Sequence, residues 1–110
     1  MTEFCKGNDL VERMYWLSQV HNDQDISWPA FNFAFAISGR FDRAAKGYAM
    51  LDPHAMAPRL RVAPLVAVRL AKELVRAGHL EQGADHLRYR GVLQDSTAAA
   101  LHRAKAVQHG

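Results

Sequence analysis

Residues 47–92 read GYAMLDPHAMAPRLRVAPLVAVRLAKELVRAGHLEQGADHLRYRGV, and this stretch decides the fold. Its first five residues, 47–51, fit a short strand. Asp52 followed by Pro53 predicts the start of a helix, because aspartate is a favoured N-cap and proline is tolerated in the first helical turn. Pro58 keeps this helix short, since an internal proline removes a backbone hydrogen bond and clashes with the preceding turn.

A second, longer helix is predicted over residues 64–77. Pro64 begins it after a turn at residues 61–63, and Gly78 ends it as a candidate left-handed C-cap. Apolar side chains recur on one face at spacings of three and four residues, which is typical of a buried helical face. These side chains are Ala67, Leu70, Ala71 and Leu74.

Two short strands, at residues 79–81 and 86–90, are predicted to pair across a loop at residues 82–85. The second strand alternates apolar and polar side chains, which is the period of a half-buried strand. Its apolar positions are Leu87 and Tyr89, and its polar positions are His86, Arg88 and Arg90. The stretch therefore predicts a strand, two helices joined by a turn, and a hairpin.

Two helices are predicted before this stretch and one after it. Asp9 and Glu12 have capping-box spacing at the start of a helix over residues 9–20, and apolar residues recur along it at helical spacing. The polar run at residues 21–25 ends this helix, and its two aspartates are interpreted as solubilising turn residues. The last helix is predicted from residue 95 or 96 to about residue 107.

Ser27 and Pro29 open the second N-terminal helix, which ends near Gly39 or continues to about Arg43. Its side chains are apolar on all sides, which predicts a helix buried against several neighbours. Its aromatic residues are therefore expected in the core; they are Phe31, Phe33 and Phe35.

The charge of the chain is unevenly distributed. The 110 residues predict one domain, and 49% apolar with 23% charged residues is an ordinary globular composition. Residues 1–38 carry two basic and five acidic side chains, whereas residues 39–91 carry ten basic and five acidic ones, and the formal net charge is +3. This asymmetry favours a polyanion as the partner of the basic segment.

Cysteine content and hydropathy indicate the cellular compartment. Cys5 is the only cysteine, so the chain offers neither an internal disulfide nor a thiolate zinc site. The N-terminus lacks the pattern of a secretory signal, and no apolar run in the sequence is long enough to cross a bilayer. We expect a cytoplasmic protein that does not enter a membrane.

The order of elements over residues 51–92 resembles that of winged helix-turn-helix proteins. The junction from Arg69 to Leu80 is similar to that family's passage from a basic helix through glycine into the wing. The resemblance implies a mainly α fold with a small β-hairpin, in which the helix-turn-helix spans about residues 52–78, the wing about residues 79–93, and N- and C-terminal helices flank them. It also implies double-stranded DNA as the ligand, with the second helix of the motif in the major groove.

Arginine and lysine side chains gather where this resemblance places the DNA. Arg69, Lys72 and Arg76 are spaced by three and four residues and so share one helix face. Leu65 and Val66 begin the same helix, where they could contact thymine methyl groups, belong to the core, or form a patch for another protein. The expected DNA-binding residues are Arg59, Arg61, Leu65, Val66, Arg69, Lys72, Arg76, Arg88 and Arg90.

The resemblance and the small size of the core also imply a homodimer formed by the flanking helices. The candidate contacts are Met14, Trp16 and Leu17 in the first helix, with Leu101 and Val107 in the last. The sequence and the resemblance therefore predict a sequence-specific transcriptional regulator, a repressor acting as a homodimer.

Other classes of function are less well supported by the sequence. The six histidines are scattered without metal-binding spacing, and although His79 and His86 would face each other across the hairpin, two ligands do not make a site. The chain has no phosphate-binding glycine loop and no nucleophile elbow. We therefore expect that it binds no metal or cofactor and has no enzymatic activity. Two rivals stay open: a protein-interaction module that blocks or adapts a host complex, and a DNA-binding accessory of replication or partition.

Overall fold

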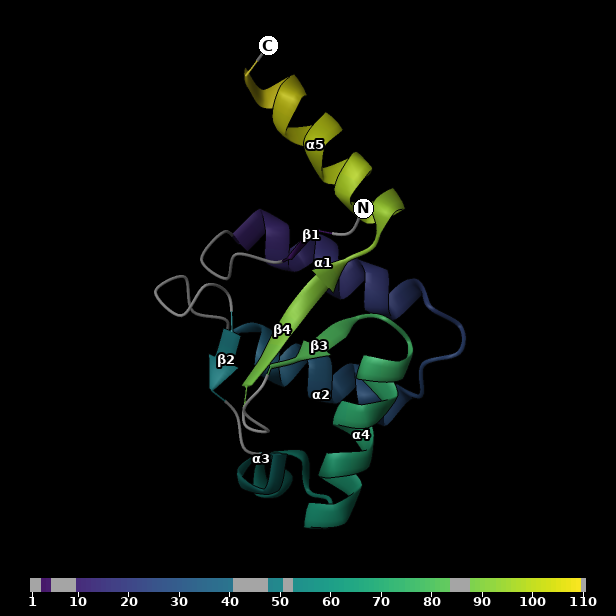
Figure 1. Ribbon diagram of the computed structural model, residues 1–110, viewed down its shortest axis with the longest axis vertical. Coiled ribbons are helices and arrows are strands. Elements are labelled where there is room, and N and C mark those ends of the chain that lie inside the picture. Colours follow the sequence, from purple (N-terminus) through teal and green to yellow (C-terminus); the bar gives the residue numbers. More distant parts are fainter. Residues whose placement is uncertain (1–2, 5–9, 41–47, 51–52, 84–87, 110) are drawn as a thin grey trace.

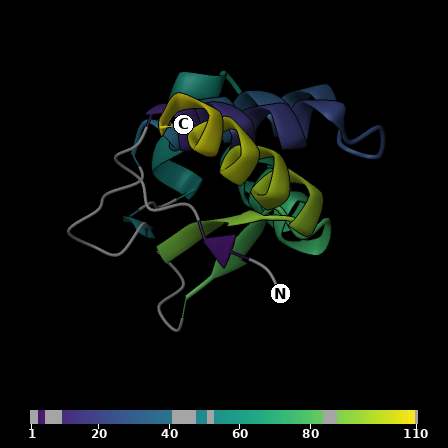
Figure 2. The same ribbon diagram turned by 90° about the horizontal axis from the view of Figure 1, so that it is seen from above.

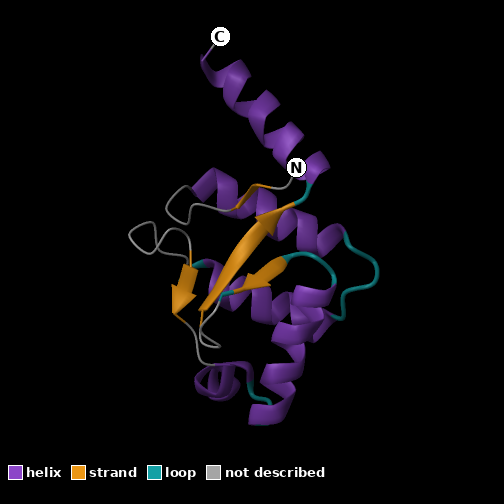
Figure 3. Ribbon diagram, in the orientation of Figure 1, coloured by secondary structure: helices purple, strands orange, loops and turns teal. Residues whose placement is uncertain are grey.

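The computed structural model describes residues 3–4, 10–40, 48–50, 53–83 and 88–109, and it is mainly helical with a small antiparallel sheet (Figures 1 and 3). In chain order the elements are β1 (Glu3–Phe4), α1 (Leu10–Asn22), α2 (Trp28–Ser38), β2 (Tyr48–Met50), α3 (Pro53–Leu60), α4 (Pro64–Arg76), β3 (Leu80–Gln82), β4 (Arg88–Leu93) and α5 (Asp95–His109).

The last strand, β4, organises the sheet. It pairs antiparallel with β2 through residues 88–90 and with β3 through residues 89–91. Because these two stretches of β4 overlap, β2 and β3 lie on its opposite edges. The far end of β4 pairs with β1, where Phe4 is opposite Val92. The strand that precedes the two helices of the predicted motif thus pairs with the hairpin that follows them.

The helices lie against one face of this sheet and at one end of it. Seen from above, α1 and α2 lie on one side of the strands, while α3 and α4 lie at the lower end of the molecule in the first view (Figures 1 and 2). The C-terminal helix α5 leaves the body at the end of β4 and extends away from it (Figure 1). The core between these elements contains Trp16, Phe33, Ile37, Met56, Leu74, Leu93 and Leu101.

Most of the predicted elements are confirmed, with shifted ends. Helix α1 continues to Asn22, so the first part of the predicted loop at residues 21–25 is helical. Strand β3 includes Gln82, which the sequence placed in the hairpin loop, and β4 continues to Leu93 rather than ending at residue 90. Pro58 lies inside the last turn of the eight-residue α3. The predicted cap Asp9, the cap Asp52, and the strand positions His86 and Leu87 lie outside the described residues.

The expectation that all the aromatic residues of α2 belong to the core is wrong in part. Phe33 is fully buried and Phe31 is partly buried, but Phe35 is 65% exposed. Two of the expected dimer contacts are also corrected, because Trp16 and Leu101 are buried inside the chain itself. Both results have the same cause: helical periodicity reveals that a side chain is apolar, but not which neighbour covers it.

A hydrogen-bond network around His79 ties α1 to the sheet. The indole Nε1 of Trp16 donates to the backbone oxygen of His79 at 2.8 Å. The amide Nε2 of Gln19 lies 2.8 Å from Nδ1 of the His79 ring and donates to the backbone oxygen of Val92 at 2.9 Å. His79 was predicted as a strand residue of the hairpin, but it is buried just before β3.

The partners of Gln19 fix the tautomer of His79. The backbone N–H of Gln94 donates to Oε1 of Gln19 at 2.8 Å, so the other end of this side chain must be its NH₂ group. That NH₂ group donates to Nδ1 of His79, which therefore carries no proton, and the ring proton lies on Nε2. Nε2 donates to Oδ2 of Asp23 at 2.7 Å. Asp23, interpreted from sequence as a solubilising turn residue, is therefore a hydrogen-bond partner of the core.

The Asp23 carboxylate also accepts a hydrogen bond from the backbone N–H of Asp25 at 2.9 Å. This backbone N–H and then the His79 ring lower the pKa of the Asp23 carboxyl below its ordinary value. A carboxyl group whose pKa is lowered by folding stabilises the native state above its unfolded pKa of about 3.9, and this contribution is lost as the pH falls through the folded pKa.

We therefore expect Asp23→Asn to reduce the acid sensitivity of the fold. At neutral pH the variant should be less stable, because a neutral amide accepts these hydrogen bonds more weakly than a carboxylate. The difference in free energy of unfolding between the two proteins should shrink as the pH falls from about 5 to below 4. Urea unfolding measured at several pH values tests this, and a difference that is constant with pH would contradict it.

Gly78 ends α4 in the left-handed region, with φ of +82°, as the sequence predicted. Its N–H donates to the backbone oxygen of Val75, and the N–H of His79 donates to that of Leu74. A Cβ at position 78 would meet only the Gln94 amide, at an ordinary 3.7 Å. The requirement for glycine at this position is therefore conformational rather than steric.

Gly78→Ala is expected to lower the free energy of unfolding by about 1–2 kcal/mol, because the left-handed conformation is sterically unfavourable for residues that carry a Cβ atom. Gly39→Ala is the matched control. Gly39 follows α2 at φ of −74° with open space around its Cβ position. That substitution should leave stability unchanged or raise it by about 0.4–1 kcal/mol. Equal losses in urea unfolding of the two variants would refute the conformational explanation.

Candidate nucleic-acid interface

Helix α4 presents one buried face and one exposed face. Ala63 precedes it in an extended conformation without a side-chain cap, and Pro64 starts it with its preset φ. Four side chains of small and medium size face the core, and they are the ones that the sequence predicted: Ala67, Leu70, Ala71 and Leu74. This burial fixes the rotation of α4 about its axis and so decides which side chains reach solvent.

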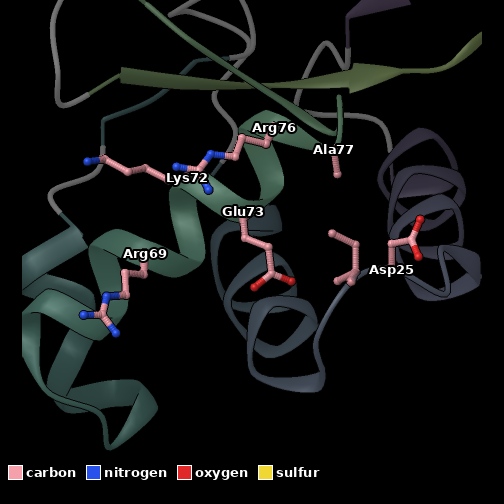
Figure 4. Close-up of a pocket in the computed structure, with 7 residues that line it drawn as sticks. Asp25, Arg69, Lys72, Glu73, Arg76 and Ala77 are labelled. Carbon is pink, nitrogen blue, oxygen red and sulfur yellow. The ribbon is translucent and has the colours of Figure 1, made fainter.

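The exposed side of α4 carries a continuous stripe of long side chains. Leu65, Arg69, Lys72 and Arg76 follow one another at intervals of four, three and four residues, so they lie along one line of the helix surface. All four are exposed. In the close-up, Arg69, Lys72 and Arg76 point to the same side of α4 and away from Asp25 (Figure 4). The structure thus brings together the three cations that the sequence assigned to one face.

A groove of about 470 Å³ lies beside this stripe, between α4 and the loop that precedes α2. Asp25 and Ile26 line it on the loop side, and the basic side chains together with Glu73 line it on the side of α4 (Figure 4). Glu73 points towards α2 rather than along the stripe (Figure 4). The negative charge of Glu73 is therefore directed away from the outermost surface of α4.

Glu73 fixes the start of α2 to α4. Its Oε2 accepts a hydrogen bond from the backbone N–H of Ser27 at 2.7 Å, and its Oε1 accepts one from the Ser27 hydroxyl at 2.9 Å. The Ser27 hydroxyl in turn accepts from the backbone N–H of Ala30 and so caps α2. The sequence predicted Ser27 at the start of this helix. It gave no signal for Glu73, because the two residues are far apart in the chain.

The turn before α4 adds two further cations. Arg59 lies in the last turn of α3 and Arg61 lies in the turn itself, and both side chains are exposed. Arg61 has φ of +56°, the left-handed region that residues other than glycine rarely adopt. Both arginines lie close in sequence to Pro64, at the end of α4 where the helix dipole is positive.

The predicted wing contributes less charge than its sequence suggests. Arg90 is half-buried, and its Nη2 donates to Oε1 of Glu81 on the paired strand at 3.1 Å. These two residues are directly opposite each other in the β3–β4 ladder. The positive charge of Arg90 is thus partly neutralised within the chain. Arg88 begins β4, and its side chain lies outside the described part of the structure.

The apolar residues at the start of α4 divide between surface and core. Leu65 is 70% exposed, whereas Val66 is partly buried and packs against the core cluster. The sequence left three roles open for these residues, and Val66 is therefore a core residue. The Leu65 side chain is free to contact a thymine methyl group or another protein.

Within the part of the chain that the structure describes, no three histidine, cysteine or acidic side chains come together as metal ligands. None of its helices combines the length and the apolar character needed to cross a membrane. Comparison with protein-family models, with curated proteins and with solved structures yields no match to this chain.

Glu73→Ala is expected to lower the free energy of unfolding by about 1 kcal/mol, because it removes both hydrogen bonds that hold Ser27. Hydrogen bonds to a charged group that solvent reaches, such as these, stabilise a fold less than buried ones do. Lys72→Ala, a change at the adjacent exposed position, should alter stability by no more than about 0.5 kcal/mol. Equal stabilities of the two variants in urea unfolding would show that the Ser27 contact does not stabilise the fold.

Proposed function

We propose that this protein is a sequence-specific DNA-binding regulator of transcription that acts as a homodimer, with α4 as its recognition helix. The observation that carries the proposal is the exposed stripe of Arg69, Lys72 and Arg76 along one line of α4. The order of elements supports a winged helix-turn-helix, because a strand, two helices and a hairpin follow one another and β4 lies between β2 and β3.

The chemistry of the stripe suits a nucleic-acid duplex. Each phosphate that a lysine or arginine neutralises releases counterions, which favours binding at low salt. Arginine can also form a bidentate pair of hydrogen bonds with the edge of guanine. The major groove is wide enough to admit one α-helix. Arg59 and Arg61 extend the positive surface beyond the start of α4. Occupation of a promoter by such a protein would repress transcription by excluding the polymerase.

Charge reversal on the stripe tests the proposal. Arg69→Glu combined with Arg76→Glu should abolish DNA binding and leave the fold intact, because both side chains are exposed. The matched control is Arg40→Glu combined with Arg103→Glu, which makes the same change in net charge at exposed positions outside α4. The control should retain most of the affinity in a mobility-shift titration. Equal losses in the two variants would show that α4 is not the contact surface.

A titration with pooled random duplex DNA at low and near-physiological salt, followed by sequencing of the retained DNA, separates specific from general binding. An enriched palindrome would support a dimeric regulator. Salt-sensitive retention without an enriched motif would instead favour an accessory DNA binder of replication or partition.

The exposed Leu65 favours a second candidate, a protein-interaction module on the same fold. An apolar side chain at the start of the recognition helix could equally insert into a pocket of a partner protein. Salt distinguishes the two functions, because a DNA complex weakens steeply as salt rises and an apolar protein interface does not. Failure to retain DNA at low salt would favour this second candidate.

A further inference from the structure

The outer surface of α1 and α2 carries an apolar face that no described part of the chain covers. We define this α1–α2 face by six residues that border one another: Met14, Leu17, His21, Trp28, Phe31 and Phe35. A shallow groove of about 390 Å³ runs between the two helices across it. The face is distinct from the basic stripe, because none of its residues belongs to α4 or to the groove beside it.

The rings on this face form an ordered cluster. Trp28 stacks on Phe31 with ring centroids 5.4 Å apart and an angle of 27° between the rings. The rings of His21 and Phe31 are T-shaped with centroids 5.3 Å apart, and the centroid of His21 lies 6.4 Å from that of Trp28. Such contacts restrict the side chains before anything binds, so little conformational entropy would be lost on association.

The exposed area of the face is comparable with that of the largest apolar patch on a typical monomer. Trp28 is 64% exposed, Phe35 is 65% exposed and Met14 is 60% exposed. A fully buried aromatic side chain encloses about 150–250 Å², and the long methionine side chain is of similar size, so these three residues leave roughly 350 Å² of apolar surface open. This value already lies within the range of about 300–600 Å² found for the largest patch on a typical monomer, and such patches are often functional.

The absence of charge on the face indicates its partner. None of the six residues is an aspartate, glutamate, lysine or arginine. A two-fold axis places a surface against its own copy, so charges of one sign would repel each other across it, whereas an uncharged apolar surface is self-complementary. DNA is excluded as the partner of this face, since phosphate binding requires cations.

We propose that the α1–α2 face pairs with the same face of a second copy of this chain. Two copies would remove roughly 700 Å² of apolar surface through Met14, Trp28 and Phe35 alone. This is about the apolar share of an interface of about 1,200 Å², the lower limit for a stable complex. The inference rests on the homodimer of the proposed function and replaces the contacts that were expected at Trp16, Leu101 and Val107.

Phe35→Asp tests the pairing in the full chain. The side chain is mostly exposed, so the fold should persist, which circular dichroism and the thermal midpoint would verify. Loss of a central aromatic contact costs an interface at least about 30-fold in affinity, and a two-fold interface loses it twice, so the dimer dissociation constant should rise roughly 1,000-fold. Sedimentation equilibrium over a range of concentrations measures this change.

Val107→Asp is the matched control, because Val107 is 81% exposed on α5 and the variant introduces the same charge. It should dimerise like the native chain. Dissociation by Val107→Asp with a persisting Phe35→Asp dimer would overturn the proposal and assign the interface to α5. A native chain that stays monomeric up to about 100 μM would overturn it as well, and the face would then belong to a different protein.

The two tryptophans provide a second readout. Trp16 is fully buried within the chain, so only Trp28 should respond to acrylamide. Acrylamide should quench Trp28 weakly in the native dimer and strongly in Phe35→Asp or on dilution. Equal quenching of Trp28 in dimer and monomer would place the interface elsewhere. Neither measurement requires DNA, so a failure of this proposal and a failure of DNA binding are separate results.

Discussion

The rest of the structure depends on the hydrogen bonds that surround the buried ring and backbone of His79. This residue lies between the end of α4 and the start of β3, and it contacts α1 through Trp16 and Gln19. A buried polar group without a partner costs about 1–3 kcal/mol, so each member of the network requires the others. The direction in which the chain leaves α4 is thus fixed by groups on the first helix.

The same constraint positions the candidate DNA-binding surface. Just after α4, Gly78 reverses the chain into the sheet, and in the last turn of α4 Glu73 holds the start of α2. The buried face of α4 then leaves a single orientation in which Arg69 and Arg76 reach solvent. Residues that contact no ligand therefore decide where the cations point, and a substitution among them would disturb the stripe without changing its charge.

Local signals in the sequence predicted much of this arrangement. Pro64 and Gly78 bounded α4 correctly, because proline at a helix start and glycine after a helix end act through their own backbone conformations. The buried face of α4 was also correct, since its period is a property of one helix. The exposed positions Arg69, Lys72 and Arg76 followed from the same period, and so the candidate site was found without the fold.

What the sequence missed was non-local. The contacts of Glu73 with Ser27 and of Asp23 with His79 join residues that only the folded chain brings together. The sequence placed Phe35 in the core and Trp16 at a dimer interface, whereas Phe35 is exposed and Trp16 is buried. Both predictions failed for the same reason, because the burial of each residue depends on which helix packs beside it. The cross-strand bond of Arg90 to Glu81 similarly required the register of β3 and β4.

The central position of β4 has a consequence for the order in which the chain folds. Among the described residues, every strand pairs with β4 and with no other strand. The sheet therefore cannot assemble on the ribosome until residue 93 has left the exit tunnel, whereas the earlier helices can form as they emerge. The β3–β4 hairpin closes a short loop, but the pairing of Glu3 with Leu93 encloses nearly the whole chain, so the N-terminal strand is expected to join last.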